Sequence, residues 1–366
     1  MPAIGSAPMF AGWQNSAMTR TAPRPLVVRF GSVGDMVLLT GLLSALHQRY
    51  QMPCDLLSGT GWPADLLAEH PDVGEVHRLE SRRRPYWTDP RQWRVVDWLR
   101  HRPPGPVYVC DDLQRAALRR LLDRAGIPAD HRLFFDDAEL AARRHWFDRL
   151  ADMAVRLPPA WAGTVEARPP ALPDQPTLIV PGSALVDLAQ WRAERGLTGQ
   201  IVLIQPGNKR TQRHGRFRSD HHKWWPIENW AQTITAVLES LPEAAVVLCG
   251  APSEQALLLA IADQCRDRRV HACGDQLPML RLMALANCAH SMIAVDSGPA
   301  HIAAALACPS VVLFGAAPTW LWTPKAPPGV PVVTVGGEPD GLDRVDRIGP
   351  DRVIAAWRTL AGRIRT

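Results

Sequence analysis

The sequence predicts an α/β fold in which two Rossmann-like, doubly wound domains face each other across a cleft. The 366-residue chain is longer than one hydrophobic core usually supports. Short apolar runs alternate with helical apolar spacing in two successive blocks, the pattern of βα units in a parallel sheet. A proline-rich segment without periodicity, residues 158–176, separates the blocks and is typical of a linker.

These observations divide the chain into four segments. Residues 1–24 lack the charged start and apolar stretch of a signal peptide, and we expect a disordered extension there. Residues 25–170 form the first predicted Rossmann-like domain and residues 171–349 the second. Residues 350–366 carry the pattern of a C-terminal helix.

The first domain opens with a buried-strand pattern, PLVVRF at residues 25–30, and helical spacing follows over residues 36–50. The turn between them has two glycines, Gly31 and Gly34, and no third, so the dinucleotide fingerprint is absent. Asp35 then places a carboxylate at a helix N-terminus. It either complements the helix dipole there or belongs to a site in the cleft.

The remaining elements follow by the same criteria. In the first domain we expect strands at residues 54–57, 75–79 and 107–110, and helices at 63–69, 111–126 and around 143–156. In the second we expect strands at 201–204, 244–248 and 270–273, and helices at 185–195, 227–241, 255–265, 278–286 and 351–364.

The most informative stretch is residues 292–315, MIAVDSGPAHIAAALACPSVVLFG. Two apolar runs flank a polar turn and an alanine-rich helix that Pro299 opens and Pro309 follows, which predicts a compact βαβ unit. Backbone N–H groups and the positive end of the helix dipole would hold a phosphate or hydroxyl groups at this turn. The alternative is that Asp296 and Ser297 only cap the helix.

Two polar segments stand outside this pattern. Residues 81–102 interleave arginines with Tyr86, Trp87, Trp93 and Trp98, which suits an anionic amphiphilic ligand, a lipid headgroup layer or a solvated helix face. Residues 205–226 form a long basic loop without periodicity, and such loops in compact domains are usually functional or disordered.

Composition narrows the class of protein. The net charge of +5 and pI near 9.0 favour an anionic partner, but no helix-turn-helix or zinc frame indicates nucleic acid. The seven cysteines include no CxxC pair, so we expect buried thiols in a reducing compartment and no disulfides or zinc ligands. No apolar run is long enough to span a membrane, and we expect a cytoplasmic protein.

Three stretches together carry a family resemblance: VRFGSVGDMVLLTGLLSAL, KWWPIENW and VDSGPAHIAAALACPSVVLFGAAP. They resemble the family 9 glycosyltransferases, chiefly bacterial ADP-heptose:lipopolysaccharide heptosyltransferases. The resemblance implies the GT-B architecture, with the acceptor in the N-terminal domain and the nucleotide sugar in the C-terminal one. It also implies inverting transfer of heptose to the lipopolysaccharide inner core, without a metal ion or other cofactor.

The resemblance assigns roles by position. Asp35 matches the general base, Lys223 the lysine at the donor phosphates, and Glu254 the acid that binds ribose. The other donor-binding positions are Asn208, Leu277, Met279, Asp296, Ser297, Gly298 and His301. The acceptor-binding positions are Gly34, Arg82, Arg83 and Arg84. The implied partner is an anionic glycolipid of the lipid A-Kdo type, which allows peripheral contact with the inner face of the cytoplasmic membrane.

These residue types suit the chemistry. A carboxylate can take the proton of an acceptor hydroxyl, and an ammonium with helix N–H groups can stabilise a departing diphosphate. Asp296 would repel a pyrophosphate, so we assign it to sugar hydroxyls or to the turn. The basic loop at residues 205–223 leaves open transfer of another nucleotide sugar in core or O-antigen synthesis, and a non-catalytic sugar-nucleotide-binding protein is a further alternative. An oxidoreductase is disfavoured by the absent fingerprint, and a serine hydrolase by the absence of GxSxG.

Overall fold

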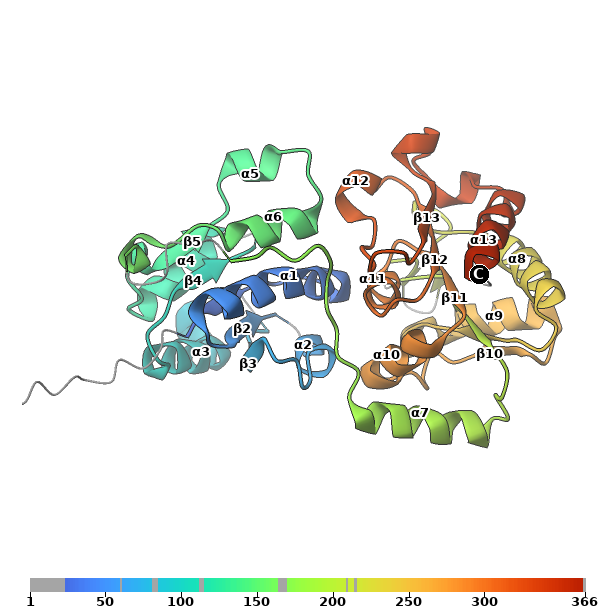
Figure 1. Ribbon diagram of the computed structural model, residues 1–366, viewed down its shortest axis with the longest axis horizontal. Helices are drawn as coiled ribbons and strands as arrows, with labels where there is room; N and C mark the ends of the chain where they lie inside the picture. Colours follow the sequence, from blue (N-terminus) through green and yellow to red (C-terminus); the bar gives the residue numbers. More distant parts are fainter. Residues whose placement is uncertain are drawn as a thin grey trace, which may run out of the picture.

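Two parallel β-sheets flanked by helices make up the protein (Figure 1). The structure is a computed structural model, and it describes residues 24–59, 61–80, 85–111, 115–163, 170–208, 210–213 and 216–364. The predicted extension at residues 1–24 lies outside this part except for Arg24. The two sheets confirm the predicted pair of doubly wound α/β units, while the predicted domain boundaries remain predictions.

The first sheet has the strand order β3-β2-β1-β4-β5, and all its pairs are parallel. The strands are β1 (Leu26–Val28), β2 (Cys54–Ser58), β3 (Val73–Arg78), β4 (Val107–Val109) and β5 (Arg132–Phe134). The order reverses direction between β1 and β4. In open α/β sheets, ligands bind outside the carboxyl ends of the strands at such a switch point. The turn after β1 therefore lies where a site is expected.

We call the first sheet with its helices the first half of the molecule, and the second sheet with its helices the second half. The helices of the first half are α1 (Val33–Tyr50), α2 (Trp62–Leu66), α3 (Pro90–His101), α4 (Arg115–Arg124), α5 (Asp137–Ala141) and α6 (Trp146–Met153). Helix α1 begins three residues before the predicted start at residue 36. Gly34 and Asp35 therefore belong to its first turn and not to the preceding loop. The earlier start has a local reason, since Asp35 bonds back to Ser32 at the helix N-cap.

The second sheet has the order β10-β9-β6-β11-β12-β13 and is also parallel throughout. Its strands are β6 (Ile201–Gln205), β9 (Ala245–Leu248), β10 (Val270–Ala272), β11 (Ser291–Val295), β12 (Ser310–Phe314) and β13 (Val332–Gly336). Here the switch point lies between β6 and β11. The stretch 292–315 forms the predicted strand, helix and strand, with α11 (Gly298–Ala305) between β11 and β12.

The other helices of this half are α7 (Gly182–Glu194), α8 (Ile227–Ser240), α9 (Gln255–Cys265), α10 (Met279–Cys288), α12 (Thr319–Trp322) and α13 (Pro350–Ile364). Helix α7 packs on α10, and α13 packs on α8, so the C-terminal helix stays with the second sheet (Figure 1). The loop at residues 205–226 is not entirely irregular as predicted, because β7 (Gln212–Arg213) and β8 (Arg216–Phe217) pair as a small antiparallel hairpin.

Helix α1 of the first half and helix α11 of the second pack against each other between the sheets (Figure 1). Met36 and Val37 of α1 share one apolar cluster with Ala300 and Ile302 of α11, all with fully buried side chains. Apolar contact thus brings the ends of β1 and β11 together. No described helix is long and apolar enough to cross a membrane.

Candidate functional site

The candidate site lies where the β1–α1 turn meets the β11–α11 turn. A Cβ atom built on Gly34 would lie 2.8 Å from Cδ2 of His301. A Cβ atom on Gly298 would lie 2.7 Å from Cβ of Val33. Both glycines are therefore required by close approach of the two halves. Residues more than 260 positions apart in the sequence thus meet at one place.

Asp35 is held on both carboxylate oxygens. Its Oδ2 accepts hydrogen bonds from the backbone N–H of Ser32 at 2.7 Å and from the Ser32 hydroxyl at 2.8 Å. Its Oδ1 lies 2.5 Å from Nη2 of Arg29. Burial is the largest influence and raises the pKa of Asp35, but Arg29 and the Ser32 bonds together outweigh it, so the pKa is below its usual value. Asp35 is therefore an ionised carboxylate, fixed in orientation, with a side chain 15% exposed.

Arg29, which positions Asp35, is a residue that the sequence analysis missed. It follows β1, and its side chain is buried. Nη1 donates to the carbonyl oxygen of Cys110 at 2.7 Å, and the guanidinium carbon lies 4.8 Å from the ring centroid of Trp146. A charge at the end of an apolar strand, PLVVRF, was the available signal, because buried arginines are rare unless they are paired.

Lys223 and Asp296 form an ion pair. The ammonium Nζ of Lys223 lies 2.5 Å from Oδ2 of Asp296 and donates to the backbone oxygen of the same residue at 2.9 Å. The two side chains are only 15% and 10% exposed. The pair removes the difficulty that the sequence raised, because an Asp296 neutralised by Lys223 repels a pyrophosphate less than a lone carboxylate would.

Ser297 and His301 carry polar atoms that lack partners in the described part of the chain. Ser297 occupies the N-cap position of α11, yet its side chain makes no capping bond. Its Oγ and the Nδ1 of His301 are buried without a hydrogen bond. Burial, more than any neighbouring charge, lowers the pKa of His301 to about 4, so the imidazole is neutral. The capping alternative for Ser297 is therefore wrong as far as its side chain is concerned.

A second pair of unpartnered oxygens lies at the same edge of the second sheet. Glu254 is buried; its Oε2 accepts from the backbone N–H of Ala251 at 2.9 Å, while Oε1 has no partner among the described residues. Burial raises the pKa of this carboxyl. Gln205, another residue that the sequence analysis missed, ends β6 with a buried Oε1 that is also without a described partner. Buried polar atoms are usually satisfied, so these oxygens are available to hydrogen-bond donors of a ligand at this edge of the sheet.

The contacts of the other predicted donor-binding residues do not by themselves indicate a ligand-binding role. Oδ1 of Asn208 accepts from the backbone N–H of Arg210 at 2.8 Å, so its side chain shapes the loop after β6. Leu277 and Met279 are half-buried against the cluster that contains α1 and α11. The predicted acceptor residues Arg82, Arg83 and Arg84 lie outside the described residues.

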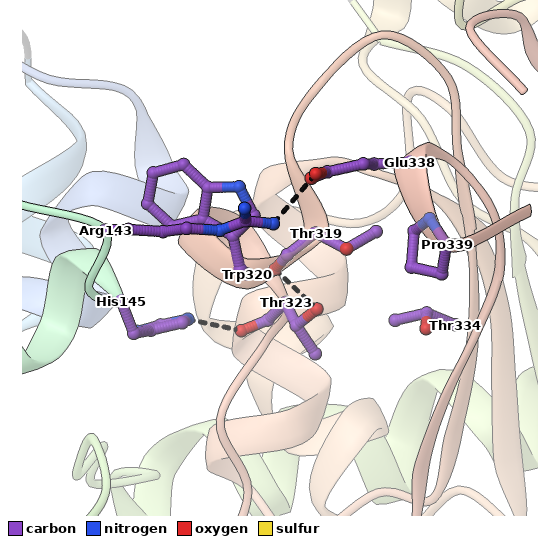
Figure 2. Close-up of a pocket in the computed structure, with 8 residues that line it drawn as sticks. All are labelled: Arg143, His145, Thr319, Trp320, Thr323, Thr334, Glu338 and Pro339. Atoms are coloured by element: carbon purple, nitrogen blue, oxygen red, sulfur yellow. Dashed lines mark hydrogen bonds and ion pairs between the residues drawn. The ribbon is translucent and has the colours of Figure 1, made fainter. Parts of the chain in front are cut away.

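A pocket of about 480 Å³ opens between the two halves beside this site (Figure 2). Arg143 and His145 line it from the first half, and Thr319, Trp320, Thr323, Thr334, Glu338 and Pro339 from the second. Arg143 pairs with Glu338 at 2.8 Å, and Nε2 of His145 lies 2.7 Å from the carbonyl oxygen of Thr323. No residue predicted from the sequence lines this pocket. His145 links the pocket to the site, because its imidazole interacts electrostatically with that of His301.

No group of three His, Cys, Asp or Glu side chains in the described ranges is placed to hold a metal ion. The chemistry without a metal therefore stays a prediction.

Known proteins of similar sequence are glycosyltransferases. Residues 190–335 match the family model described as glycosyltransferase family 9 (heptosyltransferase). The chain is 26% identical over 305 residues to lipopolysaccharide heptosyltransferase 3 of Escherichia coli, covering 80% of this chain and 83% of that protein.

The chain resembles the family 9 glycosyltransferases.

Solved structures show the same fold. The family 9 glycosyltransferase of Veillonella parvula has a TM-score of 0.71 at 16% identity, covering 94% of this chain and 99% of that one. The E. coli ADP-heptose lipopolysaccharide heptosyltransferase II has a TM-score of 0.71 at 20% identity, covering 94% and 100%. The predicted resemblance and the GT-B fold are confirmed, and the protein is a glycosyltransferase.

Proposed function

We propose that this glycosyltransferase moves heptose from ADP-heptose to an inner-core acceptor of lipopolysaccharide, with inversion at the anomeric carbon. The observation that carries the proposal is the meeting of a fixed carboxylate, Asp35, with buried unpartnered polar atoms on Ser297 and His301. The structures of an E. coli heptosyltransferase with ADP and with ADP-2-deoxy-2-fluoro heptose share the fold, at TM-scores of 0.66 and 0.61. Similarity to these heptosyltransferases suggests the sugar and the acceptor, and the site has polar groups suited to binding both.

In this proposal the donor lies along the carboxyl edge of the second sheet. Oε1 of Glu254 accepts hydrogen bonds from the ribose hydroxyls, which satisfies a buried oxygen that lacks a partner. Leu277 and Met279 provide the apolar surface against adenine. The diphosphate lies at the N-terminus of α11, where backbone N–H groups and the helix dipole favour an anion, and the Ser297 hydroxyl donates a hydrogen bond to a phosphate oxygen.

Lys223 then has two partners, Asp296 and the diphosphate. The ammonium has three N–H donors. Two of them donate to Asp296 in the structure, so one remains for a phosphate oxygen. As the bond between the anomeric carbon and the diphosphate breaks, ADP leaves with the electron pair. Lys223 and the helix N–H groups stabilise the growing charge. Asp296 orients Lys223 and faces the sugar hydroxyls.

Asp35 acts as the general base. The acceptor hydroxyl attacks the anomeric carbon from the side opposite to ADP, and its proton passes to Asp35. Such proton transfer contributes about 10²–10⁴ in rate. The ion pair with Arg29 keeps Asp35 ionised at neutral pH and fixes its orientation, at the expense of basicity.

The acceptor approaches from the side of the first half. Gly34 and Asp35 lie together in the first turn of α1, where the acceptor hydroxyl arrives, and Arg82, Arg83 and Arg84 are proposed to bind its anionic groups. The pocket between the halves adds Arg143 and Trp320, a cation and an aromatic ring that suit a charged sugar. The acceptor is a lipid A-Kdo type glycolipid, and the reaction takes place on the cytoplasmic side of the membrane.

A mass-spectrometric transfer assay tests this proposal. ADP-heptose is offered with Kdo₂-lipid A and, separately, with heptosylated acceptors, and the product is expected to gain one heptose. Thermal shifts with ADP-heptose, UDP-sugars and GDP-sugars identify the donor, because only a bound nucleotide sugar raises the melting temperature. Stabilisation by a UDP- or GDP-sugar alone would assign another donor, and donor binding without transfer to any acceptor would contradict the proposal.

A further inference from the structure

A face of the first half combines exposed tryptophans with arginines, and the reaction does not use it. Three tryptophans and three arginines define this tryptophan–arginine face: Trp62, Trp87, Trp93, Arg78, Arg91 and Arg94. They come from the start of α2, the end of β3, the 3₁₀ turn at Tyr86–Thr88 and the first turns of α3. A Cβ atom on Gly61 would lie 3.6 Å from Nη1 of Arg78, which joins the α2 and β3 portions.

The tryptophans point to solvent. The side chain of Trp87 is 73% exposed, and those of Trp62 and Trp93 are each 44% exposed. Trp93 is nevertheless fixed, because its Nε1 donates to the carbonyl oxygen of Tyr86 at 2.6 Å. The 3₁₀ turn that carries Trp87 is thereby tied to α3. The Trp93 ring is thus held outside the core in a fixed position, and exposed tryptophans on one face favour a surface built for contact.

A cavity of about 240 Å³ lies on the same face, lined by His77, Arg78, Glu80, Arg91, Arg94 and Val95. Glu80 is paired with Arg91 at 2.5 Å and with Arg78 at 3.4 Å. Arg94 is exposed and has no ion-pair partner in the described part of the chain. Three arginines against one glutamate leave the cavity cationic, so it complements an anionic group.

We propose that the tryptophan–arginine face docks the enzyme on an anionic phospholipid surface. Indole rings prefer the membrane–water interface, where an apolar body meets a polar edge, and arginines beside them bind lipid phosphates. The cavity receives one phosphodiester headgroup next to Arg94. A protein partner would favour a larger continuous apolar core, whereas here exposed tryptophans share the face with a cationic cavity.

The position of the face fits a membrane-bound acceptor. The parallel strands β1, β2 and β3 end at the same edge of the sheet, so the face and Asp35 lie at that edge. A lipid-anchored sugar could therefore reach the site while the enzyme remains docked. The docking itself requires neither the donor nor the acceptor, so it can be tested apart from transfer.

The test is co-sedimentation of the full chain with vesicles of phosphatidylglycerol and, separately, of phosphatidylcholine. We expect binding to the anionic vesicles that weakens as salt rises, and little binding to the neutral ones. Arg94→Glu changes the charge by two units and should weaken partitioning about 30-fold, and Arg94→Gln about 5-fold. Trp87→Ala should weaken it about 10-fold, through loss of apolar area.

Matched controls lie on the other half. Arg358→Glu on α13 makes the same change in net charge at another exposed position, and Leu259→Ala removes an apolar side chain that is 48% exposed on α9. Both should bind the vesicles within twofold of the parent. Circular dichroism checks that every variant folds.

Equal losses in Arg94→Glu and Arg358→Glu would overturn the proposal, because binding would then follow net charge alone. So would equal binding to both kinds of vesicle, or no binding to the anionic one. A dimer that forms without lipid and disappears in Trp87→Ala would assign the face to a second copy of the chain. None of these results would affect transfer measured on a soluble acceptor.

Discussion

The β1–α1 turn and the β11–α11 turn have the same local architecture and opposite internal bonding. Each joins a buried central strand to a helix at the switch point of its sheet. In the first turn every carboxylate oxygen of Asp35 has a partner. In the second, Ser297 and His301 keep buried polar atoms without one in the described part of the protein. In the proposed reaction, the first turn is preorganised for chemistry and the second turn binds the donor.

Replacing Asp35 should have the largest effect, and this effect should be on turnover and not on donor affinity. Asp35→Asn removes the base, and we expect turnover to fall by about 10²–10⁴. Donor affinity, measured by calorimetric titration of ADP, should stay within about threefold, because the donor bonds lie on the other turn. Asp97→Asn, an exposed aspartate on α3, is the matched control and should leave turnover unchanged. Retained turnover in Asp35→Asn would show that both turns bind and that neither supplies the base.

Replacing Lys223 should have the next largest effect, because Lys223 pairs with Asp296 in the second turn. Lys223→Met should weaken ADP binding by about 10-fold or more and slow transfer as well, because a charge-assisted bond to phosphate is worth roughly 1.5–3 kcal/mol. Lys325→Met, whose ammonium pairs with Asp148, is the matched control and should leave ADP affinity within about twofold. Unchanged ADP affinity in Lys223→Met would remove this lysine from the phosphate site.

Replacing Glu254 tests whether the second half binds the ribose of the donor. Glu254→Gln should lower ADP affinity by about 5- to 10-fold, as expected for loss of a hydrogen bond to a hydroxyl. The parent should bind 2′-deoxy- or 3′-deoxy-ADP more weakly than ADP, and the variant should discriminate less. If the parent does not distinguish these nucleotides, Glu254 does not contact the ribose.

The same carboxyl has a pH signature in stability. Burial raises the pKa of Glu254, so the folded protein holds this proton more tightly than the unfolded chain. Stability from this group is complete below the unfolded pKa and is lost as pH rises through the folded one. Glu254→Gln should therefore make the melting temperature depend less on pH between about 4 and 7. An unchanged pH dependence would contradict the raised pKa.

The smallest expected effect concerns Arg29. Arg29→Met removes the cation beside Asp35 while burial remains, so the pKa of Asp35 should rise. The acidic limb of the kcat/KM profile should then move upward by about 1–3 pH units. Arg29→Lys should restore most of the original profile. An unmoved limb with lower activity would mean that Arg29 acts through packing on Trp146.

The stability that the Arg29–Asp35 ion pair contributes depends on pH in the opposite direction to that of Glu254. The pKa of Asp35 is lower in the folded protein than in the unfolded chain, so the contribution is present above the unfolded pKa, about 3.9, and is lost as pH falls through the folded pKa. The melting temperature of Arg29→Met should approach that of the parent below about pH 3. A constant difference across this range would contradict the ion pair.

Local pattern was enough to predict the central strands of both sheets and the two turns, but not the edge strands β5 and β13. Apolar runs gave β1 and β11, and Pro299 marked the start of α11, because strand burial and helix punctuation are properties of neighbouring residues. The start of α1 was misplaced since the bond from Asp35 to Ser32 carries no apolar signal. The hairpin of β7 and β8 was missed because each strand has only two residues.

Contacts between distant residues could not be predicted in this way. Arg29 acquires its role from Cys110 and Trp146, and the Lys223–Asp296 pair joins residues 73 positions apart. The pocket at Arg143 and His145 exists only because α6 packs near α12 across the two halves. Gln205 was predicted as the first residue of the loop 205–226, whereas it ends β6. Such sites follow from tertiary packing, which a single sequence does not specify.

A crystal structure with ADP bound tests most directly whether the two turns build one site. We expect the β-phosphate within hydrogen-bonding distance of Ser297 Oγ and Lys223 Nζ, the ribose at Glu254 Oε1, and the Asp35 carboxylate facing the leaving group from the first half. ADP seated instead in the pocket of Arg143 and Trp320, with Ser297 and Glu254 still without partners, would contradict the account.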